Sequence, residues 1–137
     1  MISLPSSVRI YLAAKPVDMR KGIDGLMGDV RGVLKGDPYS GHLFVFVGRR
    51  ADRVKVLYWD RGGFVLTCKR LECGRFRVPP IGPGAQSVRM DSAELGMLLE
   101  GIDFSRVRRP VPWMPNASYR TGFGAEVGEK LDSATDP

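Results

Sequence analysis

Two β-rich runs joined by a glycine-rich turn constrain the fold of this chain most. Residues 53–59 alternate in size and polarity, and a second run follows at residues 64–70. The alternation divides the side chains of the first run between the two faces of a strand. The intervening segment Asp60-Arg61-Gly62-Gly63 is typical of a tight turn. The sequence therefore predicts an antiparallel β-hairpin.

Further strands are predicted on both sides of this hairpin. Residues 8–12 are a short β-rich run, and residues 43–47 are continuously apolar, as in a central strand buried on both faces. Residues 75–78 predict a strand before a proline-rich loop, and residues 88–90 predict a short strand after it. We therefore expect five or six strands in an antiparallel meander sheet.

Two helices are predicted, one near the N-terminus and one after the sheet. Asp18 is a plausible N-cap, and apolar residues recur at helical spacing from Met19 to Lys35. Asp91 and Glu94 have the spacing of a capping box, which predicts a second helix that ends at Gly101. Together with the sheet, these helices predict the α+β class.

Length and composition indicate one globular domain. Of 137 residues, 43% are hydrophobic and 26% are charged, which is ordinary for a folded domain. We expect the domain to span residues 1–103, and residues 104–137 to be a proline-rich, polar and poorly packed tail. The first residues lack a basic leader, and no run reaches the ~18 apolar residues of a membrane span. These features predict a cytoplasmic protein with no membrane partner.

Positive charge is concentrated in one segment. Residues 49–77 contain nine basic and three acidic residues, an excess equal to the net charge of +6 of the whole chain. Clustered cations with aromatic residues among them are typical of surfaces that bind nucleic-acid phosphates. A solvated strand face is the alternative explanation.

The alternation of the predicted hairpin assigns these cations to a surface. If Val54, Val56 and Tyr58 face the first helix, then Arg53, Lys55 and Trp59 lie on an open face of the sheet, where an indole and cations could contact bases and phosphates. Alternatively, Trp59 is half-buried under the second helix. The candidate nucleic-acid-binding residues include a second group at the start of the first helix and are Arg49, Arg50, Arg53, Lys55, Trp59, Arg61, Lys69, Arg70, Arg20 and Lys21.

Residues suited to catalysis or metal binding are sparse. Cys68 and Cys73 lack the spacing of a zinc site and are expected to be free thiols, and the single histidine, His42, is expected to bond to backbone. The acids of the sheet region have structural explanations, which leaves a metal-dependent nuclease as a remote alternative. We therefore predict no enzymatic activity, no metal and no cofactor.

Several phrases occur together in an order that resembles a known family. They are Pro16-Val17-Asp18-Met19-Arg20-Lys21-Gly22, Gly41-His42-Leu43-Phe44-Val45-Phe46, Asp52-Arg53-Val54-Lys55-Val56-Leu57, Trp59-Asp60, Lys69-Arg70-Leu71-Glu72, Gly74-Arg75-Phe76 and Leu98-Leu99-Glu100-Gly101-Ile102-Asp103. The set resembles the accessory protein encoded by the second open reading frame of the insertion-sequence sixty-six family of bacterial transposable elements.

This resemblance implies a protein encoded beside a larger transposase and required for efficient movement of the element. Members of the family have no established biochemical activity. We therefore expect a non-catalytic accessory factor that binds DNA at the element ends, the cognate transposase, or both. Two alternatives stay open: an adaptor for the transposase that binds no nucleic acid, and a module for RNA or single-stranded nucleic acid. The sequence predicts no oligomeric state.

Overall fold

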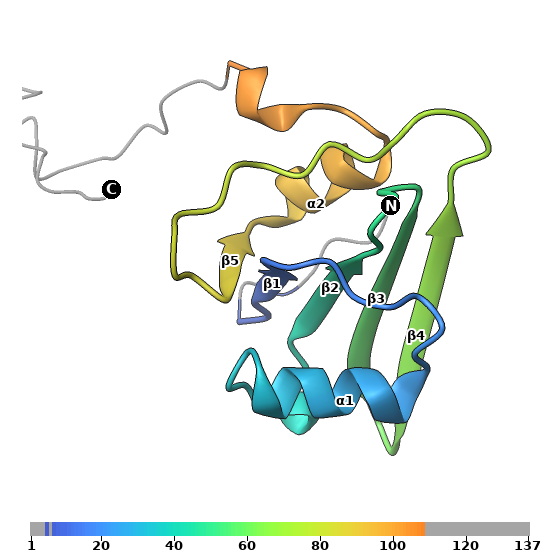
Figure 1. Cartoon of the computed structure of the whole chain (residues 1–137). Helices are drawn as coiled ribbons and strands as arrows, with labels where there is room; N and C mark the ends of the chain where they lie inside the picture. Colours follow the sequence, from blue (N-terminus) through green and yellow to red (C-terminus); the bar gives the residue numbers. More distant parts are fainter. Residues whose placement is uncertain (1–4, 6, 109–137) are drawn as a thin grey trace, which may run out of the picture. The chain divides into compact units, whose positions relative to one another are not determined.

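Five strands form one sheet with the order β4-β3-β2-β1-β5 (Figure 1). The structure is a computed structural model, which describes residue 5 and residues 7–108. Its elements in chain order are β1 (Ile10–Ala13), α1 (Ile23–Gly32), the 3₁₀ turn η1 (Pro38–Ser40), β2 (Leu43–Val47), β3 (Arg53–Asp60), β4 (Gly63–Arg70), β5 (Ser87–Met90), α2 (Ser92–Leu99) and the 3₁₀ turn η2 (Phe104–Arg106).

The sheet is mixed, so the expected purely antiparallel meander is wrong. Strands β2, β3 and β4 follow one another antiparallel, but β1 pairs parallel with β2, and β5 returns antiparallel beside β1. The parallel pair arises because α1 carries the chain back across the sheet before β2 begins. The strand expected at residues 75–78 is irregular chain, in which Phe76 is buried. The α+β class and a count of five strands are confirmed.

The predicted hairpin is confirmed and is paired along its whole length. Its register runs from Arg53 opposite Arg70 to Asp60 opposite Gly63. The two-residue loop between the strands has positive φ at both positions, 39° at Arg61 and 85° at Gly62. Such a loop matches the right-handed twist of the strands that it joins.

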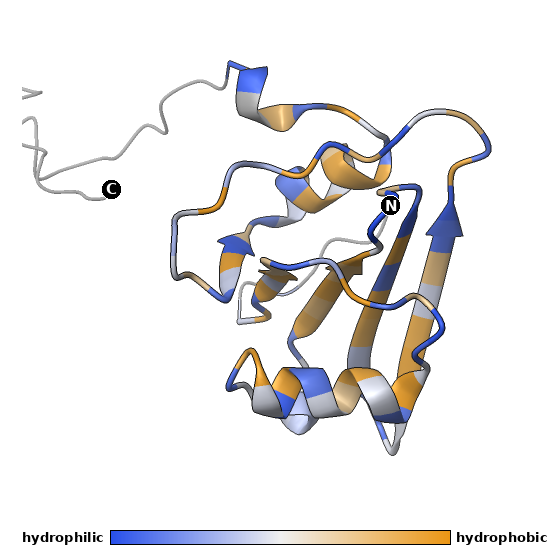
Figure 2. Cartoon of the chain, in the orientation of Figure 1, coloured by the Kyte–Doolittle hydropathy of each residue, from blue (hydrophilic) through white to orange (hydrophobic). Residues whose placement is uncertain are grey.

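A helix covers each face of the sheet. Figure 2 shows hydrophobic positions, in orange, along the strands, on α2 and at intervals along α1. On the α1 face, Leu26 and Val30 of the helix pack with Phe46 and Leu57 of the sheet. The opposite face, the α2 face, has its own buried cluster, which contains Leu12, Val45, Val54, Val56, Leu95 and Leu98. The sheet therefore lacks the open face expected from the sequence, and Val54 and Val56 face α2 rather than the first helix.

The first helix begins later than predicted. It starts at Ile23 with Gly22 as its N-cap, so the expected cap at Asp18 is wrong. Residues 17–21 are instead an irregular segment, the strap, within the stretch of chain that crosses the α1 face between β1 and α1 (Figure 1). At α2 the predicted capping box is present, with hydrogen bonds in both directions between Asp91 and Glu94.

The end of the described chain packs on the domain. Phe104, in η2, packs against the buried cluster of the α2 face. Most of the predicted tail, residues 109–137, lies outside the described residues. Among the helices that the structure describes, none has the length and apolar character needed to cross a bilayer.

Candidate nucleic-acid interface

The strap and the turn between β2 and β3 line an open, arginine-rich cavity of about 380 Å³. We call it the arginine cavity. The strap contributes Arg20, the turn contributes Arg49 and Arg50, and Arg53 begins β3. The described lining is Val17, Asp18, Met19, Arg20, Gly48, Arg49, Arg50, Asp52 and Arg53. Two basic groups that the sequence treats as separate sites are therefore brought together.

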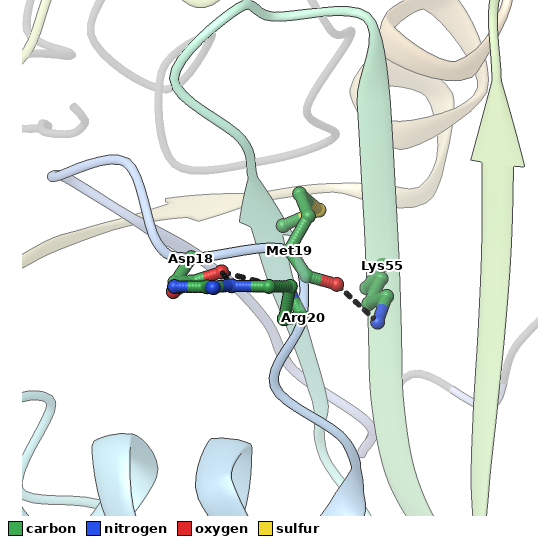
Figure 3. Close-up of polar contacts among 4 residues, drawn as sticks. All are labelled: Asp18, Met19, Arg20 and Lys55. Carbon is green, nitrogen blue, oxygen red and sulfur yellow. Dashed lines mark hydrogen bonds and ion pairs between the residues drawn. The ribbon is translucent and has the colours of Figure 1, made fainter.

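Three contacts hold the strap against the sheet. The backbone N–H of Val17 donates to the carbonyl oxygen of Val47 at 3.1 Å. From β3, the ammonium group of Lys55 donates to the carbonyl oxygens of Met19 (2.8 Å) and Lys21 (2.9 Å), as Figure 3 shows for Met19. The Met19 side chain occupies space that a Cβ atom on Gly48 would need, because that atom would lie 2.6 Å from Met19 Cγ.

These contacts change the expected role of Lys55. The sequence places its side chain on an open face, ready for phosphate, and that placement is wrong. Its ammonium group is part-buried and bonded to backbone beneath the strap. Lys55 therefore positions Arg20 indirectly, by fixing the backbone on either side of it. No sequence signal identifies this role, since the partners are backbone carbonyl groups 36 and 34 residues away.

Arg20 and Asp18 form a close ion pair at the rim of the cavity (Figure 3). Arg20 Nε lies 3.0 Å from Asp18 Oδ1, and Nη2 lies 2.7 Å from Oδ2. Hydrogen bonds from the side chain and then the backbone N–H of Arg20 hold the pKa of Asp18 well below its usual range. The same side-chain bond raises the pKa of Arg20 above its usual value. The Arg20 side chain is 91% exposed, so the pair orients it without removing it from water.

The other arginines of the cavity have no such partner. Within residues 7–108, no carboxylate forms an ion pair with Arg49, Arg50 or Arg53. Asp52 is the second acid of the lining, against four arginines. The cavity therefore carries an excess of guanidinium groups, which match phosphate oxygens with paired N–H donors.

Several predicted site residues lie elsewhere. Arg61 lies in the turn at the far end of β3 from Arg49 and Arg50. Lys69 belongs to the α2 side of the hairpin, where its ammonium group donates to the carbonyl oxygen of Leu99 at 2.7 Å. The prediction that Arg61 and Lys69 share a surface with the arginines of the cavity is therefore wrong.

Arg70 and Lys21 lie closer to the cavity but are already paired. Arg70 is opposite Arg53 in the hairpin and forms an ion pair with Glu72 at 2.8 Å. Lys21 belongs to the strap and pairs with Asp29 of α1 at 2.9 Å. Their charges add to the field around the cavity, although their donors have partners within the domain.

Trp59 belongs to an aromatic cluster away from the cavity. Its ring centroid lies 5.1 Å from that of Phe64 and 5.1 Å from that of Tyr39, which is in η1. The indole is half-buried. The rings that cover it belong to β4 and η1. The alternative prediction is therefore right that Trp59 is half-buried, but wrong that the second helix covers it.

The described residues contain no group of three potential metal-binding side chains. His42 Nδ1 accepts a hydrogen bond from the backbone N–H of Arg9 at 3.0 Å, which confirms the prediction for this histidine. Cys68 and Cys73 are exposed free thiols. Among the described residues, the cavity lining contains only arginine and aspartate as ionisable side chains, a set suited to anion binding.

Comparison with known proteins identifies the family. The IS66 Orf2-like protein family matches residues 8–109. The chain belongs to this family. Two uncharacterized proteins of Sinorhizobium fredii (strain NBRC 101917 / NGR234) are similar to it. Protein y4jC is 42% identical over 109 residues, covering 80% of this chain and 92% of y4jC. Protein y4hO is 40% identical over 114 residues, covering 82% and 96%. No solved structure matches.

The IS66 Orf2-like match confirms the resemblance identified from the ordered phrases of the sequence. It includes the strap and the turn between β2 and β3, and thus every described residue that lines the arginine cavity. The cavity is therefore part of the family domain of this protein.

Proposed function

We propose that this IS66 Orf2-like protein is a non-catalytic accessory factor in transposition that binds element DNA through the arginine cavity. The family match supports the association with an insertion sequence. The observation that carries the DNA-binding role is the convergence of four arginines on one cavity, three of them without an ion pair in the described structure.

The local geometry favours phosphate as the ligand. Guanidinium groups bind phosphate oxygens through two parallel N–H bonds, which lysine cannot offer. The strap is fixed to the sheet by Lys55 and Gly48, so the backbone that carries Arg20 is ordered before a ligand arrives. Prior ordering lowers the entropy cost of binding.

The proposal is tested by fluorescence anisotropy with a labelled duplex from the element end, at about 50 mM and about 200 mM salt. The Arg49→Glu/Arg50→Glu variant reverses two charges in the cavity. We expect weaker binding, and a log–log salt slope that is shallower by about 0.9 for each phosphate that the variant no longer neutralises. Thermal melts of the variant verify that it folds.

A matched control reverses two charges outside the described lining of the arginine cavity. Arg9 and Arg89 are both exposed and line a different cavity, beside β5. The Arg9→Glu/Arg89→Glu variant has the same change in net charge, and we expect it to retain most of the affinity of the native protein. Equal reductions in affinity in both double variants would contradict a localised site.

Binding that does not depend on salt, or no binding by the native chain, would overturn the DNA-binding role. Co-purification with the transposase at high salt would then test the adaptor alternative.

A further inference from the structure

The arginine cavity has no aromatic side chain in its described lining. Trp59, the aromatic residue of the predicted surface, instead packs against Tyr39 and Phe64. The Trp59 ring meets Tyr39 at an interplanar angle of 62° and Phe64 at 68°, which is edge-to-face packing. Base stacking on an aromatic ring requires a free ring face close to the phosphate contacts.

The aromatic cluster is also too far from the cavity to read the same nucleotide. Arg53 and Trp59 are six residues apart on β3. At a rise of about 3.3 Å per residue, this separation is about 20 Å along the strand. A phosphate and the base of its own nucleotide lie much closer together than that. The two surfaces therefore cannot act as one site for a single nucleotide.

We propose that the arginine cavity binds the sugar-phosphate backbone of duplex DNA in preference to single-stranded nucleic acid. This inference rests on the proposed function and specifies its ligand. Duplex DNA presents one charge per about 1.7 Å of axis, more than a single strand, so a purely electrostatic site favours the duplex. Stacking on aromatic rings, which favours single strands, has no surface in the described lining of the cavity.

The test compares three labelled ligands with the full chain: an element-end duplex, a duplex of the same length and composition with shuffled sequence, and a single strand. We expect both duplexes to bind, because phosphate contacts do not depend on base sequence. We expect the single strand to bind several-fold more weakly at the same salt concentration.

A fluorescence measurement tests stacking directly. The chain has two tryptophans, Trp59 and Trp113, and the second lies outside the described residues. A Trp113→Phe variant leaves Trp59 as the single indole reporter and changes no residue of the described cavity lining. We expect unchanged Trp59 emission when the protein is saturated with duplex, whereas a stacked base quenches indole fluorescence.

The outcomes separate this inference from the proposed function. Tighter binding of the single strand, or quenching of Trp59, overturns the inference and leaves DNA binding standing. Failure of all three ligands to bind overturns both.

Discussion

The Nζ atom of Lys55 lies 2.8 Å from the carbonyl oxygen of Met19, so a strand residue holds the segment that carries Arg20. The same ammonium group also donates to the carbonyl oxygen of Lys21 at 2.9 Å. Loss of this side chain removes both bonds and leaves two carbonyl groups of the strap without their protein donor.

Replacing Lys55 by methionine is expected to lower the free energy of unfolding by about 1–3 kcal/mol, because hydrogen bonds to charged groups are stronger than neutral ones. Urea denaturation measures this change, and hydrogen exchange of the strap amides should rise. The control is Arg53→Met, which removes a positive charge from the same strand and face but breaks no hydrogen bond present in the described structure. Equal stability of the two variants would contradict the anchoring role.

Substitution of Gly48 by alanine is expected to displace Met19. The new Cβ atom would lie 2.6 Å from Met19 Cγ, and Gly48 is not among the positive-φ glycines, so the effect comes from contact alone. We expect the free energy of unfolding to fall by about 1 kcal/mol or more, since overpacking forces side chains from their preferred rotamers. A double-mutant cycle with Met19→Ala measures the coupling. Additive effects in the cycle would show that the two residues do not compete for space.

Substitution of Asp18 by asparagine is expected to tighten DNA binding about twofold or more, because it removes a negative charge from a site that attracts phosphate. Asparagine retains an oxygen for the Arg20 backbone N–H, so the turn of the strap is preserved. Anisotropy titration at low salt measures the change. Weaker binding would indicate that orientation of Arg20 by the carboxylate matters more than its charge.

Acid titration gives a second test of the same ion pair. The pKa of Asp18 is depressed in the folded state, so the stabilisation is complete above the ordinary value of 3.8 and is lost as the pH falls below it. The stability advantage of the native protein over Asp18→Asn should therefore shrink between about pH 5 and about pH 3. The advantage is small because the pair is exposed and screened. A stability advantage that grows as the pH falls would contradict the assignment of a depressed pKa to Asp18.

Removal of the α2 cap is expected to destabilise the domain. Asp91→Ala removes the side chain that accepts from the Glu94 backbone N–H at 2.8 Å, and such changes cost about 0.5–2 kcal/mol. Chemical denaturation of Asp91→Ala, Glu94→Ala and the double variant measures the effect. The reductions in stability should be less than additive, since the two residues form one reciprocal unit.

Local signals in the sequence predict the hairpin and the second helix well. The turn before Phe64 requires residues that accept positive φ, and glycine marks that requirement directly. At α2, Asp91 and Glu94 have the three-residue spacing of a capping box. Both features depend on residues within a few positions of one another, so the sequence alone specifies them.

The start of α1 and the covering of the sheet are not specified locally. Asp18 accepts from the backbone N–H of Arg20, two residues on, and this turn uses the same side-chain oxygen that a helix cap would use. The alternation of side chains along β3 correctly places Val54 and Val56 on the opposite face of the sheet from Lys55. Alternation alone, however, does not show which face each helix covers. The helix between β1 and β2 is a sequence signal for their parallel pairing. The prediction of an antiparallel meander does not take this signal into account.

The turn that carries Arg49 and Arg50 is clamped from two directions. The strap lies on its α1 side, while the chain after β4 returns to donate from Leu71 N–H to the Asp52 carbonyl at 2.8 Å and from Phe76 N–H to the Ala51 carbonyl at 2.6 Å. Phe76 is itself buried. These contacts hold the loop in one conformation. Changes in affinity among variants of Arg49 and Arg50 should therefore report the removed charge rather than altered loop motion.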